Sequence, residues 1–123
     1  MASQGECLEI RSFVRGYHVY MDTWDPTVGE ILHLENEPSN SQDRRAVAVK
    51  TNGRIVGHAP RGFSSAVFYY LSRPCNRGVV EITGMKINRG AGYGLEVPCI
   101  YRFSGPEHYL RRLKEFLKDY LKD

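Results

Sequence analysis

The segment from Gly29 to Arg61 carries the clearest indication of the fold. It reads GEILHLENEPSNSQDRRAVAVKTNGRIVGHAPR. Asn52 and Gly53 lie between two short runs of alternating apolar residues, and both residue types tolerate the positive φ angles of a type I′ turn. The pattern therefore predicts a β-hairpin preceded by one more strand. The three expected strands are Glu30 to Leu34, Ala46 to Lys50 and Arg54 to His58.

Polar residues crowd the connection between the first two of these strands. The segment 38–43 reads Pro-Ser-Asn-Ser-Gln-Asp, and such side chains hydrogen-bond the nearby backbone in turns. On spacing alone, this composition favours a surface loop that turns the chain.

The motif around this loop is specific. Glu-Pro-Ser-Asn-x-x-Asp-x-x-Ala-Val-x-Val begins at Glu37, and Asn-Gly-x-x-Val-Gly-His-x-Pro begins at Asn52. The chain resembles the HIRAN domain family from about Phe13 to Phe103. That resemblance implies a small OB-like antiparallel β-barrel that binds the 3′-hydroxyl end of single-stranded DNA. Members occur in helicase-like DNA-repair enzymes, in a repair nuclease and as free-standing proteins, so a larger helicase or nuclease is an expected partner.

The resemblance also implies roles for individual residues. Asp43 is expected to accept a hydrogen bond from the terminal hydroxyl, because a carboxylate attracts that donor and repels the phosphate of a continuing strand. Asn40 is expected to orient the loop or contact the terminal nucleotide. Phosphate contacts are expected from His58 and Arg61, and base stacking beside Tyr20 and His18. Two further cations, Lys86 and Arg89, complete the expected DNA-binding set.

Two positions depart from the well-studied DNA-binding members. Those have a tyrosine immediately before the loop aspartate, where this chain has Gln42, and an aromatic residue where this chain has Val19. Both changes remove stacking surface, so weaker or altered end binding is expected.

Length and composition indicate one globular domain at 10–123, after a flexible lead-in at 1–9. No apolar run approaches the roughly 18 residues that suggest a membrane span, and the N-terminus lacks the basic and apolar regions of a secretory signal. A nuclear location is expected, or a cytoplasmic one in a prokaryote, with no membrane partner.

Catalytic and metal-binding patterns are missing from the sequence. The three cysteines are widely spaced and form no Cys-x-x-Cys pair, which argues against a disulfide framework and a zinc site. Cys99 is expected to be a small buried residue. We expect no enzyme activity, metal or small-molecule cofactor, although a spatial dyad of His58 and Asp43 is left open.

Positive charge gathers in the middle of the chain. The net charge is +3, but residues 44–105 contain ten basic and two acidic residues. If the basic side chains converge in space, they form a positive face for phosphates; otherwise they are dispersed solvated charges. The ten residues are Arg44, Arg45, Lys50, Arg54, Arg61, Arg73, Arg77, Lys86, Arg89 and Arg102.

The remaining segments predict further strands and two helices. Strands are expected at 10–21, with a bulge at Gly16, at 79–86, and at 95–103, where Pro98 indicates an edge or a bulge. The Gly-rich segment 88–94 predicts a hairpin loop, and its Arg89 and Tyr93 are candidates to close over a ligand. A mid-chain helix is expected from Ala59 to Pro74, and an amphipathic helix follows a capping box at 104–107.

The expected fold is therefore mostly β with two helices (α+β), a small OB-like antiparallel barrel. The favoured function is a non-enzymatic module for single-stranded DNA 3′ ends in DNA repair or replication. The alternative is a protein–protein interaction adaptor that keeps the barrel without binding DNA.

Overall fold

The predicted hairpin forms as expected in the computed structural model, which describes residues 7–88 and 94–118. Strands β3 (Ala46–Thr51) and β4 (Arg54–His58) pair antiparallel around Asn52 and Gly53. These two turn residues have φ angles of 52° and 77°, the positive values that the Asn-Gly pair predicted.

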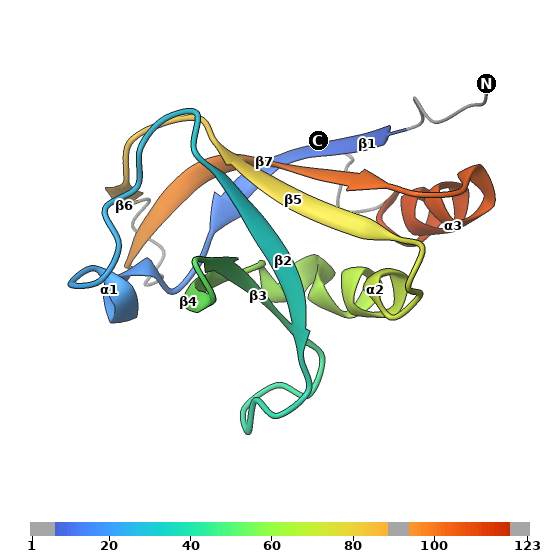
Figure 1. The fold of residues 1–123 in the computed structure, drawn as a ribbon, viewed down its shortest axis with the longest axis horizontal. Helices are drawn as coiled ribbons and strands as arrows, with labels where there is room; N and C mark the ends of the chain where they lie inside the picture. Colours follow the sequence, from blue (N-terminus) through green and yellow to red (C-terminus); the bar gives the residue numbers. More distant parts are fainter. Residues whose placement is uncertain (1–6, 89–93, 119–123) are drawn as a thin grey trace.

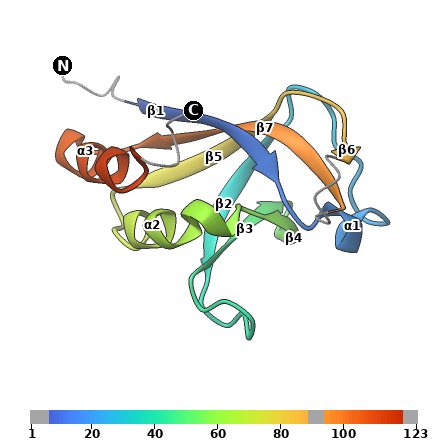
Figure 2. The same cartoon turned by 180° about the vertical axis from the view of Figure 1, so that it is seen from behind.

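Six strands form one antiparallel sheet in the order β1-β7-β5-β2-β3-β4, and β6 pairs only with β7 among the described strands (Figure 1). Figures 1 and 2 show a strongly curled sheet, in which β2 crosses from β5 and β7 to the β3–β4 hairpin. The remaining strands are β1 (Cys7–Val14), β2 (Ile31–Glu37), β5 (Arg77–Ile82), β6 (Ile87–Asn88) and β7 (Leu95–Ser104).

The curled sheet does not close into a barrel. Its two ends, β1 and β4, meet at a single isolated bridge between Arg15 and His58, where each main-chain N–H donates to the other residue's carbonyl at 2.8 Å. The mostly β fold with two longer helices is confirmed, but the closed OB-like barrel is not.

The first strand is shorter than predicted. It spans Cys7–Val14, so it includes three residues of the expected lead-in and ends before Gly16. Gly16 has a φ of 78° and precedes a short helix, α1 (Tyr17–Tyr20), instead of a bulge in a continuing strand. This left-handed glycine turns Tyr20 away from the line of β1 and onto a helix.

Other boundaries also differ from the predictions. β2 runs on to Glu37, which is opposite Ala46 in β3, and β5 ends at Ile82. Pro98 is not on an edge strand: it lies opposite Phe13 in β1, one residue beyond the end of the β5–β7 pairing. Proline is tolerated at this position because the β5–β7 pairing ends at Cys99, so no described strand pairs with Pro98 on that side. The loop at 89–93 lies outside the described residues.

Two helices complete the fold, and they lie side by side at one end of the sheet (Figures 1 and 2). Helix α2 (Arg61–Leu71) buries Phe63, Val67 and Tyr70, the face that its periodicity predicted. Helix α3 is Glu107–Phe116. Its N-cap is Pro106, with no side-chain capping hydrogen bond, so the predicted capping box is wrong.

The core fills the space between the curled sheet and these helices. Phe63 meets Tyr101 edge to face with ring centroids 5.2 Å apart, and Trp24 is 6% exposed. Cys99 is buried, as predicted, and burial raises the pKa of its thiol to about 12, which disfavours a reactive thiolate. Within the described residues, none of the helices combines the length and apolar character that crossing a membrane requires.

Candidate functional site

A cavity of about 560 Å³ opens where the β2–β3 loop, helix α1, the end of β1 and the β4–α2 connection meet. Five of the predicted site residues line it, although they come from four separate segments. The five are Tyr20, Asn40, Asp43, His58 and Arg61. We call this cavity the loop pocket.

Asn40 holds the loop in shape. Its Oδ1 accepts hydrogen bonds from the main-chain N–H groups of Gln42 at 2.9 Å and Asp43 at 3.1 Å. Its Nδ2 donates to Oε1 of Glu37 at 3.2 Å, and its own N–H donates to the Glu37 carbonyl. The side chain thus orients the loop, one of the two roles that the family resemblance implied.

Asp43 uses part of its hydrogen-bonding capacity inside the loop. Its Oδ1 accepts from the Arg45 N–H at 3.0 Å, and its carbonyl accepts from the Ala46 N–H at 3.1 Å. The structure gives Oδ2 no donor from residues 7–88 and 94–118. One oxygen of the carboxylate therefore anchors the loop, while the other remains for an outside donor.

Glu37 and His58 form the closest polar pair in the loop pocket. Nε2 of His58 lies 2.6 Å from Oε1 of Glu37, and both side chains are about one-quarter exposed. Burial acts to raise the pKa of Glu37, but hydrogen bonds from His58 and Asn40 outweigh it and lower the pKa. Glu37 is therefore held in its charged form.

Tyr20 provides the aromatic wall of the loop pocket. Its ring centroid lies 6.4 Å from that of His58, with the planes tilted by 47°. Burial, together with the negative charge of Glu37, raises the pKa of Tyr20, so its phenol stays protonated at neutral pH. Beside it, Val19 is 65% exposed and also lines the pocket.

Two arginines bring positive charge to the loop pocket. Arg61 is the first residue of α2, whose first turn contains no acidic residue and whose N-cap is Pro60. Arg15 also lines the pocket, with its Nε 3.0 Å from Oε2 of Glu96, a fully buried carboxylate. An anion at the start of α2 meets the positive end of the helix dipole and the Arg61 side chain.

The remaining predicted residues are His18, Lys86 and Arg89. His18 lies in α1, next to the pocket residue Val19. Lys86 is exposed elsewhere, with its Nζ 5.6 Å from the centroid of the Tyr17 ring. Arg89 lies outside the described residues, as does Tyr93.

The basic residues of the described part of the chain do not gather at the loop pocket. Of the basic residues at 44–88 and 94–105, Arg61 is the one that lines the loop pocket. Arg102 instead pairs with Glu9 and Glu81, and Lys50 pairs with Glu35. The charges are dispersed because neighbouring residues on a strand point to opposite faces of the sheet.

The sequence predictions missed two polar residues of the pocket, Arg15 and Glu37. Glu37 is the first residue of the quoted motif, so a signal was present, but its partner His58 is 21 residues away. Arg15 carries no local signal, because its place depends on the bridge between the two ends of the sheet.

Among the described residues, no group of three or more His, Cys, Asp or Glu side chains is arranged to hold a metal ion. The lining residues offer a ligand hydrogen-bonding groups, charged groups and the Tyr20 ring.

Comparisons with known proteins agree with this geometry. The HIRAN domain family model matches residues 8–91. The crystal structure of the HIRAN domain of human HLTF superposes with a TM-score of 0.72 at 24% identity, covering 94% of this chain and 93% of that chain. The structure of the HLTF HIRAN domain in its DNA-bound conformation gives a TM-score of 0.66 at 22% identity, covering 95% and 93%.

A protein from Lactobacillus plantarum shares the fold more loosely. Its TM-score is 0.52 at 17% identity, with 80% of this chain and 99% of that chain covered. The search of curated proteins finds no match. Because the family model covers more than half of the sequence, the chain belongs to the HIRAN domain family.

Proposed function

We propose that this chain is a DNA-binding module that recognises the 3′-hydroxyl end of single-stranded DNA in the loop pocket. The observation that carries the proposal is the convergence of Tyr20, Asn40, Asp43, His58 and Arg61 on one open cavity. Support also comes from the family, since the HLTF HIRAN domain has a DNA-bound structure.

Asp43 selects the strand terminus in this proposal. A 3′-hydroxyl donates a hydrogen bond to Oδ2, the carboxylate oxygen that the loop does not use. A strand that continues, or ends in a phosphate, places negative charge beside the same oxygen. Charge-assisted hydrogen bonds are about twice as strong as neutral ones, so the carboxylate favours the free end. Its charge repels a phosphate, so it also disfavours the blocked end.

Arg61 and the start of α2 hold the phosphate next to the terminal nucleotide. The helix start offers main-chain N–H groups and the positive end of the dipole, and Arg61 adds a full charge. Glu37 pairs with His58 at 2.6 Å and Glu96 pairs with Arg15 at 3.0 Å, so among the described lining residues Arg61 is the cation without a carboxylate partner.

Tyr20 is the base-stacking residue. A base stacked on an aromatic ring contributes about 1 to 3 kcal/mol, and Tyr20 is the one tyrosine, phenylalanine or tryptophan among the described lining residues. We therefore infer weak binding with little sequence preference. DNA repair or replication beside a larger helicase or nuclease, in a nucleus or a prokaryotic cytoplasm, is the proposed setting.

The test is fluorescence anisotropy with two oligo(dT) strands that carry a 5′ fluorophore and differ only at the 3′ end. We expect the 3′-hydroxyl strand to bind about tenfold more tightly than the 3′-phosphate strand, which corresponds to about 1.4 kcal/mol. Equal affinities would contradict end recognition while leaving general DNA binding in place. No binding of either strand at low salt would contradict the proposal as a whole.

A further inference from the structure

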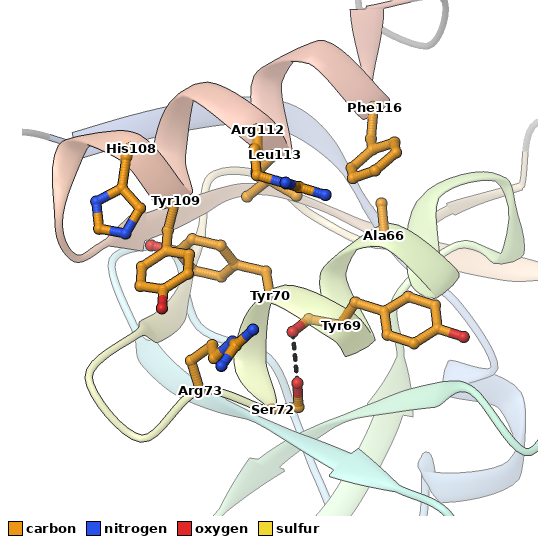
Figure 3. Close-up of a pocket in the computed structure, with 10 residues that line it drawn as sticks. All are labelled: Ala66, Tyr69, Tyr70, Ser72, Arg73, His108, Tyr109, Arg112, Leu113 and Phe116. Atoms are coloured by element: carbon orange, nitrogen blue, oxygen red, sulfur yellow. Dashed lines mark hydrogen bonds between the residues drawn. The ribbon is translucent and has the colours of Figure 1, made fainter.

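A second cavity, of about 510 Å³, lies between helices α2 and α3 (Figure 3). It shares no lining residue with the loop pocket. We call it the interhelical groove. Its lining residues are Ala66, Tyr69, Tyr70, Ser72, Arg73, His108, Tyr109, Arg112, Leu113 and Phe116.

The groove has an apolar floor and unusually exposed aromatic walls. Tyr70 and Leu113 belong to the core and are 6% and 2% exposed. Tyr69 and Phe116 are 54% and 65% exposed, and Figure 3 shows the Phe116 ring reaching from α3 toward Ala66 on α2. Large apolar side chains left open to water around a concave floor are typical of a binding surface.

The charge around this groove has one sign. Arg73 and Arg112 line it together with His108, and none of the described lining residues is acidic. Within the described parts of the chain, neither arginine has a carboxylate partner, whereas Arg111 on the outer side of α3 pairs with Glu107 at 2.9 Å. The groove therefore offers positive charge that the fold itself does not neutralise.

A guanidinium group lies over each of three aromatic rings at the groove. Arg112 lies over the Phe116 ring at 5.8 Å, and Arg73 lies over the Tyr109 ring at 5.5 Å. Arg45, at the rim, lies over the Tyr69 ring at 5.1 Å. Nucleic-acid bases stack on open ring faces, so these pairs make the groove a poor stacking platform.

A protein segment fits the same features better. An apolar side chain of such a segment fits over Leu113 and Ala66. Carboxylates on either side of that anchor, also from the segment, meet Arg73 and Arg112. We propose that the interhelical groove binds an acidic protein segment that carries large apolar anchors, in the manner of a helix or strand laid into a groove. This surface is separate from the DNA site and tethers the module to a partner protein.

The test uses a phage-displayed library of random peptides of about twelve residues, selected on the whole chain. We expect enriched peptides to carry net negative charge and at least one Leu, Ile, Phe or Trp. Their synthetic forms are then titrated into the protein and followed by amide chemical shifts. Changes are expected in α2 and α3 rather than in the β2–β3 loop.

Variants locate the interaction. Arg112→Glu and Phe116→Ser alter exposed groove residues, and each is expected to weaken peptide binding by about tenfold or more. Lys114→Glu is the matched control, because Lys114 is an exposed cation of the same helix that does not line the groove. It is expected to change the affinity by less than about twofold.

Three results would overturn the proposal. They are a selection that enriches no acidic apolar peptides, peptide binding that survives both groove variants, and equal losses in Lys114→Glu and Arg112→Glu. A groove that responds to a 3′-phosphate oligonucleotide instead of the peptides is a nucleic-acid site, and this also overturns it. None of these outcomes affects end recognition, which is read from the anisotropy assay.

Discussion

Nε2 of His58 and Oε1 of Glu37 lie 2.6 Å apart and join the hairpin strand β4 to the end of β2 inside the loop pocket. Glu37 in turn receives the Nδ2 hydrogen bond of Asn40. One carboxylate therefore connects the loop that carries Asp43 to the strand that leads into α2. The pocket depends on this connection for its shape.

The first prediction concerns the pH dependence of stability. Because the folded-state pKa of Glu37 is lowered from 4.5, its charged form stabilises the fold above about pH 4.5, and this contribution is lost as the pH falls through the lowered value. We expect Glu37→Gln to reduce the free energy of unfolding by about 1 kcal/mol at pH 6. The difference from wild type shrinks toward about pH 3 in urea unfolding.

A Glu37→Gln penalty that stays constant from about pH 6 to pH 3 would contradict this account, because packing rather than charge would then explain the loss. Glu35→Gln is the control. Its side chain is 63% exposed and pairs with Lys50 outside the pocket, so a change below about 0.5 kcal/mol is expected.

The second prediction concerns end selectivity. Asp43→Asn keeps an oxygen that accepts from the Arg45 N–H, so the loop is expected to stay in place, but the charge is lost. We expect the preference for a 3′-hydroxyl over a 3′-phosphate end to fall by about tenfold, chiefly because the phosphate end is no longer repelled. Asp25→Asn, at an exposed position outside the pocket, is the control, and an unchanged preference in Asp43→Asn counts against the assignment.

The third prediction separates affinity from selectivity. Arg61→Ala is expected to weaken binding to both ends equally and to reduce the slope of log K against log salt by about 0.7, the value for one phosphate contact on a single strand. Arg54→Ala removes an exposed arginine that does not line the pocket. The same slope in Arg54→Ala and Arg61→Ala would remove Arg61 from the proposed site.

The fourth prediction concerns the join between the two ends of the sheet. A Cβ atom on Gly57 would lie 2.9 Å from the Arg15 carbonyl oxygen and closer still to Cγ1 of Val14. Gly57→Ala is therefore expected to push β4 away from β1 and to lower the free energy of unfolding by about 1 to 3 kcal/mol. Because this shift displaces His58, DNA binding is also expected to weaken. Hydrogen exchange of the His58 amide, which donates to Arg15, measures the opening directly.

The parts of the fold that depend on short-range patterns were predictable. Asn52-Gly53 predicted the hairpin turn, and the apolar spacing of 63–71 predicted the buried face of α2. Local hydrogen bonding explains the success at Asn40, because both of its Oδ1 donors lie within three residues.

Long-range closure was not predictable in the same way. The route of the chain after β1 depends on one left-handed glycine, Gly16, and the sequence pattern allowed a strand to continue through it. Arg15 reaches the pocket because β1 meets β4 in space. A count of charges along the sequence says nothing about that meeting.

The last prediction concerns a variant with an aromatic residue at position 19, where this chain has Val19 and the DNA-binding members it resembles have an aromatic side chain. Val19 lines the loop pocket beside Tyr20 and is 65% exposed, so a larger side chain fits without disturbing the core. We expect Val19→Tyr to tighten binding of a 3′-hydroxyl oligonucleotide by about 1 kcal/mol, the low end for one base on one ring, because an exposed ring is not preorganised. Val28→Tyr, at another exposed position outside the pocket, is the matched control. A gain in both variants indicates nonspecific contact, whereas a gain confined to Val19→Tyr places the terminal base against α1.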